Sequence, residues 1–393
     1  MSLIAYLLCL IVLLLFVPVL VLFVQVVLAF FSVTKVPYNS VDEIRIAILI
    51  PAHNEESGIA KTMESLLPEV KPGDQILVVA DNCSDSTASI VRQFPPAEVI
   101  ERENAIDRGK GFALDFGVKH LSACPPDVLV IVDADCLVDK GSIRKLAERS
   151  HLEGRPVQAL YLMQSPMGAG IKTLISEFAW LLKNLVRPLG YSSLNLPCQL
   201  MGSGMAFPWE LICQAKLANG NIVEDLQLGL DLCRLGKPSL FFPDAKVTSL
   251  FPSTEEALTG QRTRWEHGHL GVILNEAPSM IVQSILKRNK DLFALAVDLL
   301  VPPLALLLLL LSVLTLVCGV ASMFGLSSFS LSLVLVEDIL LILAVFLAWY
   351  GWGRSIIPIK TFLLIPFYII AKIPSYFKFV FKRQKTWVRT ERD

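Results

Sequence analysis

The chain has 393 residues, of which 53% are hydrophobic, and its mean hydropathy is +0.57. This composition is too apolar for an ordinary soluble protein, and the length predicts two or three domains. The formal net charge of −1 argues against nucleic-acid binding.

The first 34 residues contain no charged residue and no histidine. About 20 consecutive apolar residues suffice to cross a bilayer, so residues 3–33 are predicted to form a transmembrane helix with a kink at Pro18. The apolar run is too long for a cleavable signal peptide. Lys35 and Arg45 follow it, which predicts that its C-terminal end is cytoplasmic. The first predicted domain is therefore an N-terminal transmembrane helix over residues 1–34.

Residues 44–275 have the composition of a globular domain. Short β-branched runs such as QILVVAD (75–81) and DVLVIVDADC (127–136) alternate with helical patterns. Strands separated by helices are typical of a mostly parallel sheet that helices cover on both faces. We therefore expect an α/β domain on the cytoplasmic side of a membrane.

The C-terminal part is again apolar. Residues 276–298 are predicted to form an interfacial amphipathic helix, and residues 299–353 two transmembrane helices, the first bent near Pro302 and Pro303. Residues 354–393 are predicted to form an interfacial or re-entrant helix and a basic cytoplasmic tail, because lysines interrupt the apolar pattern. Whether residues 356–381 cross the membrane stays open.

Polar clusters follow four of the predicted strands, at 53–56, 81–82, 108–110 and 133–135. In open α/β sheets, ligands bind at the carboxyl ends of the strands. Asp133 and Asp135 lie on the same side of an extended chain, so both can hold one hard cation that also binds a diphosphate. Taken alone, the pair could equally be a solvated turn.

Other nucleotide-binding motifs do not occur near these strands. There is no Walker-type loop and no G-x-G-x-x-G, which argues against an ATPase or a dinucleotide dehydrogenase. The eight cysteines form no C-x-x-C pair, which predicts reduced thiols.

Two further segments each allow two interpretations. Glu224 and Asp225 begin a predicted amphipathic helix, where acidic residues are common for electrostatic reasons alone. The segment QRTRW (261–265) could be an interfacial tryptophan with snorkelling arginines, or a sugar platform beside a diphosphate clamp.

The order of the motifs is more specific than any one of them. PAHNE, ADNCSDSTA, DAD, GSG, VED and QRTRW follow one another along the chain. In this the chain resembles the membrane-bound family 2 glycosyltransferases, the group of cellulose synthase, hyaluronan synthase and poly-N-acetylglucosamine synthase. The resemblance implies a GT-A type fold, flanking transmembrane helices, a nucleotide-diphosphate sugar donor, and Mg²⁺ or Mn²⁺ as cofactor.

The resemblance also implies a role for each matching residue. Asp225 would be the general base, with Glu224 beside it as a further catalytic residue. Arg264 would stabilise the leaving diphosphate, and Asp135 with Asp133 would hold the metal. The implied donor-binding residues are Pro51, Asn54, Glu55, Asp81, Lys110 and Asp133. The implied acceptor-binding residues are Gly202, Ser203, Gly204, Gln261 and Trp265.

These roles predict an inverting transferase on the cytoplasmic side of the cell membrane, in contact with membrane lipids. It would move N-acetylglucosamine or glucose from a UDP-sugar to a growing polysaccharide, alone, as a homo-oligomer or with a partner subunit. Val223 and Arg262 stand where processive enzymes usually have Thr and Gln, and few spans are present. An alternative is therefore a single addition to a lipid acceptor, because glycolipid-forming enzymes share Q-x-x-R-W. A non-catalytic nucleotide-sugar-binding subunit would not need both Asp135 and Asp225.

Overall fold

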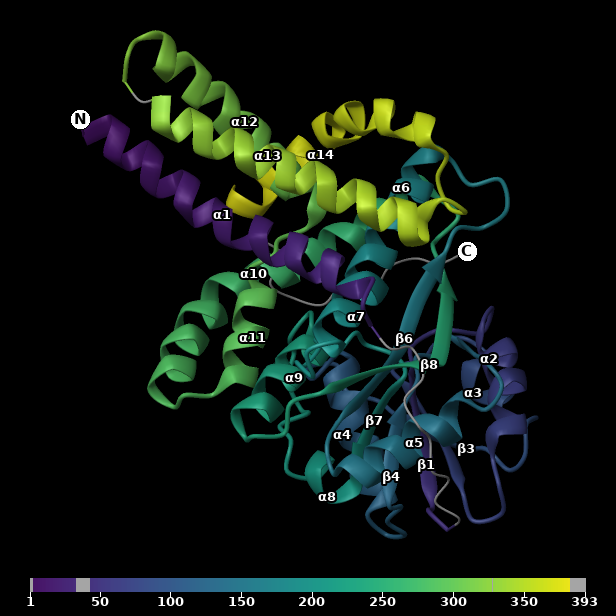
Figure 1. Ribbon diagram of the computed structural model, residues 1–393. Helices are drawn as coiled ribbons and strands as arrows, with labels where there is room; N and C mark the ends of the chain where they lie inside the picture. The colour runs from purple at the N-terminus through teal and green to yellow at the C-terminus, as the bar shows by residue number, and fades with distance from the viewer. Residues whose placement is uncertain (1–2, 33–42, 327, 382–393) are drawn as a thin grey trace. The chain divides into compact units, whose positions relative to one another are not determined.

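The computed structural model describes residues 3–32, 43–326 and 328–381, and Figure 1 shows their arrangement. These residues divide into two compact units. The globular unit holds residues 43–169 and 196–268, and the helical unit holds residues 3–32, 170–195 and 269–381. The predicted Lys35 and basic-tail signals lie outside the described residues.

The globular unit is built on one eight-stranded sheet in the order β3-β2-β1-β4-β7-β6-β8-β5. Strands β3, β2, β1 and β4 are parallel, β7 runs antiparallel to both β4 and β6, β6 and β8 are parallel, and β5 is antiparallel to β8. The predicted mostly parallel sheet is confirmed. The strands are β1 Ile46–Ala52, β2 Gln75–Asp81, β3 Glu98–Arg102, β4 Val128–Ile131, β5 Leu137–Val138, β6 Val157–Gln164, β7 Met205–Pro208 and β8 Leu240–Leu250.

Helices lie on both faces of this sheet (Figure 1). Alternate residues of a strand point to opposite faces. Leu49, Leu129 and Phe207 belong to one buried cluster with residues of α4, α8 and α9, while α5 packs against β4, β6, β7 and β8. The helices are α2 Ile59–Leu66, α3 Thr87–Val91, α4 Lys110–Leu121, α5 Ser142–Glu153, α8 Trp209–Ile212 and α9 Glu224–Arg234, with a 3₁₀ turn at Leu67–Glu69.

The helical unit contains four helices that are long and apolar enough to cross a membrane, at 3–29, 304–323, 328–353 and 359–379. Within this unit α1, α12 and α13 run side by side (Figure 1). Its α-helices are α1 Leu3–Ala29, α6 Ile171–Leu181, α7 Arg187–Ser192, α11 Lys290–Leu299, α12 Leu304–Met323, α13 Ser328–Ala348 and α14 Ile365–Phe381. It also contains π-helical segments at Leu182–Val186 and Trp349–Gly353 and a 3₁₀ helix at Ile359–Leu364. Helix α10, Glu255–Leu286, has residues in both units.

Three features differ from the sequence prediction. Residues 170–195 interrupt the predicted 44–275 domain, because their helices belong to the helical unit; charged residues within them hid this in the sequence. The predicted 276–298 helix is divided between α10 and α11, since Asn289 caps α11 by accepting hydrogen bonds from the amides of Asp291 and Leu292. The predicted bend near Pro302 and Pro303 is a complete break between α11 and α12.

A buried polar cluster joins three helices of the helical unit. Gln25 Nε2 of α1 donates to Asp298 Oδ1 at 2.6 Å, and Arg187 Nη2 of α7 donates to the same oxygen at 2.7 Å. Arg187 Nε also donates to Gln25 Oε1 at 3.1 Å. Removing one member of such a cluster leaves an uncompensated polar group, so it fixes α1 against α7 and α11.

Candidate active site

A cleft opens at the carboxyl ends of β1, β2 and β4, where the strand order places three polar loops together. It encloses about 910 Å³, counting the open solvent at its mouth. The lining residues are Pro51, Ala52, His53, Asn54, Glu55, Asp81, Asn82, Arg108, Gly109, Lys110, Ala113, Asp133, Ala134, Asp135 and Arg264. All residues predicted to bind the donor and the metal are therefore in one cleft.

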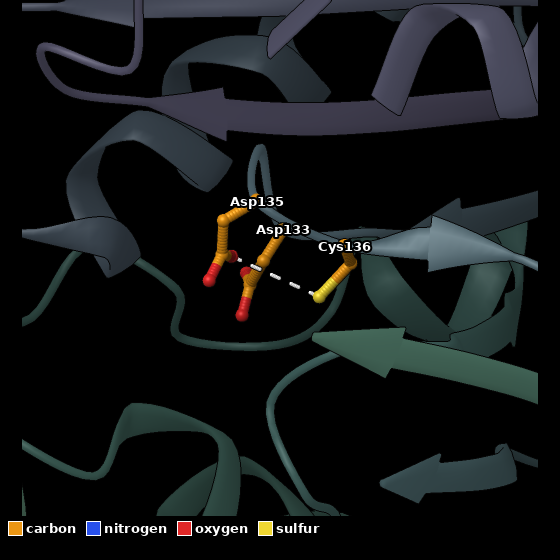
Figure 2. Close-up of side chains that lie close together, drawn as sticks. All are labelled: Asp133, Asp135 and Cys136. Carbon is orange, nitrogen blue, oxygen red and sulfur yellow. Dashed lines mark hydrogen bonds between the residues drawn. The ribbon is translucent and has the colours of Figure 1, made fainter. Parts of the chain in front are cut away.

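The acidic pair follows β4, and its two carboxylates point to the same side of the chain (Figure 2). One ligand atom each of Asp133, Asp135 and Cys136 lies within 4.8 Å of the others. The backbone amide of Asp133 donates to Ser203 Oγ at 3.0 Å, and Ser249 Oγ donates to Asp135 Oδ2 at 2.8 Å. The Cys136 thiol is buried, and burial raises its pKa well above the usual value, so the carboxylates are the better cation ligands. Two fixed carboxylates fit Mg²⁺ or Mn²⁺.

Lys110 pairs with Asp133 of the acidic pair and with Glu224. It is the first residue of α4, and its Nζ lies 2.5 Å from Asp133 Oδ1, 2.7 Å from the carbonyl oxygen of Gly202 and 3.7 Å from Glu224 Oε1. Burial lowers the pKa of Lys110, but the charges of Asp133, Glu224 and Asp225 outweigh burial and hold that pKa above its ordinary value. Lys110 therefore stays charged.

Glu224 and Asp225 begin α9, as the sequence predicts. Gly202 has φ +98, and a Cβ at this position would lie 3.3 Å from Asp225 Oδ2 and 3.9 Å from Asp133 Oδ2. The glycine thus lets Asp225 approach the acidic pair closely. Burial, with the charge of Asp225, raises the pKa of Glu224 to about 7 against the opposing effect of Lys110. Burial and the charge of Asp135 likewise raise the pKa of Asp133 against Lys110.

The opposite end of the cleft is formed by the ends of β1 and β2. His53 Nδ1 lies 2.7 Å from the carbonyl oxygen of Asp81, so this nitrogen carries the proton and donates. Asn54 Oδ1 accepts from the amide of Ser84 at 2.7 Å, which ties the loop after β1 to the loop after β2. Asp81 forms an ion pair with Arg102 at 2.6 Å.

The residues predicted to bind the acceptor occupy different surroundings. Gly202 lies beside Asp225, whereas Ser203 is fully buried and supports Asp133, and the amide of Gly204 donates to Ile131 in the sheet region. Gln261 and Trp265 do not line the cleft, although Arg264 does. Gln261 is fully buried, and neither polar atom of its amide has a hydrogen-bond partner among the described residues.

Sequence reasoning singled out the polar clusters but gave no role to several lining residues. His53, Asn82, Arg108 and Gly109 belong to those clusters, so the rule of strand ends could have included them. Arg102 is the last residue of β3 and carries the same signal, since its strand lies next to β2. Gln158, which donates to Ser203 and accepts from Met201, gave no signal because it lies inside an apolar strand.

Known proteins are similar to this chain in sequence. A probable glycosyltransferase, YdaM, from Bacillus subtilis is 27% identical over 278 residues, which are 64% of this chain and 60% of that protein. Poly-beta-1,6-N-acetyl-D-glucosamine synthase from Staphylococcus epidermidis is 23% identical over 266 residues, or 60% of this chain and 57% of the synthase. The chain thus matches less than two thirds of the length of these relatives.

A solved structure has the same fold. The mannosyltransferase PcManGT from Pyrobaculum calidifontis, solved with GDP-Man and Mn²⁺, matches 96% of this chain and 100% of its own with a TM-score of 0.56 at 17% identity. The globular unit accordingly has a GT-A type fold. The sequence profile described as "Glycosyltransferase like family 2" matches residues 44–268, a range that contains every residue lining the cleft. Since this range is more than half of the chain, the protein belongs to glycosyltransferase family 2.

Proposed function

We propose that this protein is an inverting, membrane-embedded transferase that moves N-acetylglucosamine or glucose from a UDP-sugar to a growing polysaccharide. The observation that carries the proposal is that Asp81, Lys110, Asp133, Asp135 and Arg264 share one cleft, with Asp225 beside it. We assign the end of the cleft at β1 and β2 to the nucleoside and the end at Asp133 and Asp135 to the diphosphate, an arrangement that suits a nucleotide-sugar.

Asp133 and Asp135 are the residues that would hold Mg²⁺ or Mn²⁺. Their carboxylate oxygens are close together. Ser249 donates to the Asp135 carboxylate, and Ser203 accepts from the backbone amide of Asp133, so hydrogen bonds hold both residues in place. When bound, the cation would stabilise negative charge on the diphosphate as it leaves. Manganese in the PcManGT structure agrees with this choice.

The chain's own charges would do the remaining work. Arg264 lines the cleft, and Lys110 is held above its ordinary pKa, so both can stabilise the leaving diphosphate without gaining or losing a proton. Asp225 would accept the proton of the acceptor hydroxyl, which attacks the anomeric carbon as the bond to the diphosphate breaks. Attack from the face opposite the diphosphate inverts that carbon.

The acceptor is proposed to bind near Gly202, Ser203, Gly204, Gln261 and Trp265. Support for a polysaccharide comes from the poly-beta-1,6-N-acetyl-D-glucosamine synthases among the relatives. The four apolar helices indicate membrane association. We place the globular unit on the cytoplasmic face, where nucleotide-sugars are available, with lipids as neighbours and a partner subunit or second copy as further contacts.

The test is to incubate the purified protein with a panel of UDP-sugars and Mg²⁺ or Mn²⁺, and to analyse the products by mass spectrometry. A ladder of oligomers from one UDP-sugar supports the proposal. One discrete glycolipid would instead identify a single addition to a lipid. Absence of both transfer and donor hydrolysis with every sugar would contradict catalysis by this cleft.

A further inference from the structure

Asp81 and Arg102 end two neighbouring parallel strands and stand opposite each other in the register of β2 and β3. Arg102 Nη1 donates to Asp81 Oδ1 at 2.6 Å. The two side chains are only 11% and 8% exposed, unlike the nearby pair Arg92–Glu101, whose side chains are 53% and 55% exposed. The Asp81–Arg102 pair is therefore shielded from water and geometrically fixed, whereas an exposed pair contributes little.

The guanidinium of Arg102 also contacts an aromatic ring. Its Cζ lies 5.7 Å from the ring centroid of Phe112 on α4, a cation–π contact. The carbonyl oxygen of Arg102 accepts a hydrogen bond from the amide of Asn82 at 2.7 Å. Asp81 and Asn82 line the cleft and Arg102 does not. Any effect of Arg102 on a bound ligand must therefore act through these neighbours.

The two oxygens of the Asp81 carboxylate are not equivalent. Oδ1 accepts from Arg102 and also from Asn82 Nδ2 at 3.0 Å. Among the described residues, none donates a hydrogen bond to Oδ2. An ionised carboxylate only accepts hydrogen bonds, and Oδ2 is the oxygen that is left to accept one from a ligand in the cleft.

We propose that Arg102 is a positioning residue that makes Asp81 an oriented, acceptor-only contact for the donor nucleobase, and so selects bases that present a ring N–H. Uracil and guanine have such a ring N–H, whereas the corresponding ring nitrogen of cytosine or adenine is an acceptor and faces repulsion from the carboxylate. This inference rests on the proposed nucleotide-sugar donor. The base preference would then depend on a residue of β3 that does not line the cleft.

The variants Arg102→Gln and Arg102→Lys test the proposal, with Arg92→Gln as the matched control. Arg92→Gln removes the same charge from the exposed pair beside it. Titration calorimetry with Mn²⁺ gives the affinities for UDP and CDP, and donor kinetics give KM and kcat. We expect Arg102→Gln to weaken UDP binding about tenfold, to narrow the preference for UDP over CDP, and to leave kcat at saturating donor within a few-fold. Arg92→Gln should match the wild type.

The outcomes separate this inference from the proposed function. UDP affinity and UDP-to-CDP preference equal to wild type in Arg102→Gln would overturn the positioning role alone. If wild-type protein binds no nucleoside diphosphate with Mn²⁺, the proposed function fails as well. A purely structural role would reduce the fraction of active protein and kcat without changing the base preference. If Arg102→Gln does not fold, Arg102→Lys tests the proposal instead. Lysine keeps the positive charge but lacks the planar guanidinium that fixes the carboxylate. An unchanged preference for UDP over CDP in Arg102→Lys would contradict the proposal.

Discussion

Lys110 Nζ lies 2.5 Å from Asp133 Oδ1, and this contact joins the first residue of α4 to the acidic pair after β4. The ammonium group lies between Asp133 and Glu224 and balances their negative charge. The site therefore carries its own counter-charge, which keeps several buried carboxylates together before a donor arrives.

Replacing Lys110 by Met should lower the midpoint of thermal unfolding by several degrees without divalent cations, because Asp133 and Glu224 lose their counter-charge. Mn²⁺ should restore more stability to this variant than to the wild type. Differential scanning fluorimetry with and without Mn²⁺ measures both effects. The control is Lys119→Met, on the same helix, whose 74% exposed side chain pairs with Asp115 and should contribute almost nothing. Equal midpoints for both variants would contradict this role.

Asp135→Ala should abolish divalent-dependent donor binding, because the carboxylate is a proposed direct ligand of the cation. Loss of groups that merely orient metal ligands already costs about 10–100-fold in affinity, so we expect at least about 100-fold here. Asp139→Ala is the control, since Asp139 is about half exposed and pairs with Lys246 at 3.3 Å. Calorimetric titration of UDP at varied Mn²⁺ concentrations measures this effect. A wild-type dependence of UDP affinity on Mn²⁺ in Asp135→Ala would show that Asp135 is not a metal ligand.

The pKa of Glu224 predicts a pH dependence of stability in the metal-free protein. Its native pKa is about 7 and its ordinary value 4.5, so between these values the native state holds a proton that the unfolded state has released. The stability that this proton contributes is greatest below about pH 4.5 and is lost as the pH rises through about 7. Unfolding midpoints of wild type should therefore fall more steeply between pH 5 and 8 than those of Glu224→Gln. Parallel curves would show that Glu224 ionises normally; Glu153→Gln, from the surface pair with Arg149, serves as control.

Gln261 gives a prediction that separates function from packing. Its amide is fully buried, with no hydrogen-bond partner among the described residues, and such a group costs about 1–3 kcal/mol. Gln261→Leu should therefore keep or increase the free energy of unfolding and leave UDP affinity unchanged, yet lose transfer to the acceptor. The contrast is Gln158→Leu, which deprives Met201 and Ser203 of hydrogen bonds and should lower stability. Full transfer activity in Gln261→Leu would limit Gln261 to filling space.

The sequence predicted those features that depend on local pattern. The apolar runs ending in Asp81 and Asp133 indicated parallel strands, and the rule for strand ends then placed the cleft correctly. The start of α9 at Glu224 followed from its amphipathic pattern. These features can be predicted because a strand and its polar end are determined by a few adjacent residues.

Features that depend on distant contacts could not be predicted. The support of Asp133 by Ser203 joins residues 70 positions apart, and the Arg187–Asp298 pair joins residues 111 apart. Residues 170–195 show mixed polar and apolar composition, so only their packing assigns them to the helical unit. Pairing across such distances depends on the tertiary arrangement rather than on periodicity.

We propose that Asp225 is the general base of a glycosyl transfer. Asp225→Asn keeps the shape of the side chain and one acceptor oxygen, so the cleft and donor binding should persist. An amide cannot accept the hydroxyl proton at neutral pH, and the expected loss of turnover is on the order of 10²-fold or more. If Asp225 were only favourable charge at the start of α9, the change would cost less than about 1 kcal/mol of stability and activity would persist. The decisive measurement is the transfer rate of Asp225→Asn at saturating donor, together with its donor affinity. We expect wild-type donor affinity with turnover reduced at least about 10²-fold, and transfer within a few-fold of wild type would show that Asp225 is not the base.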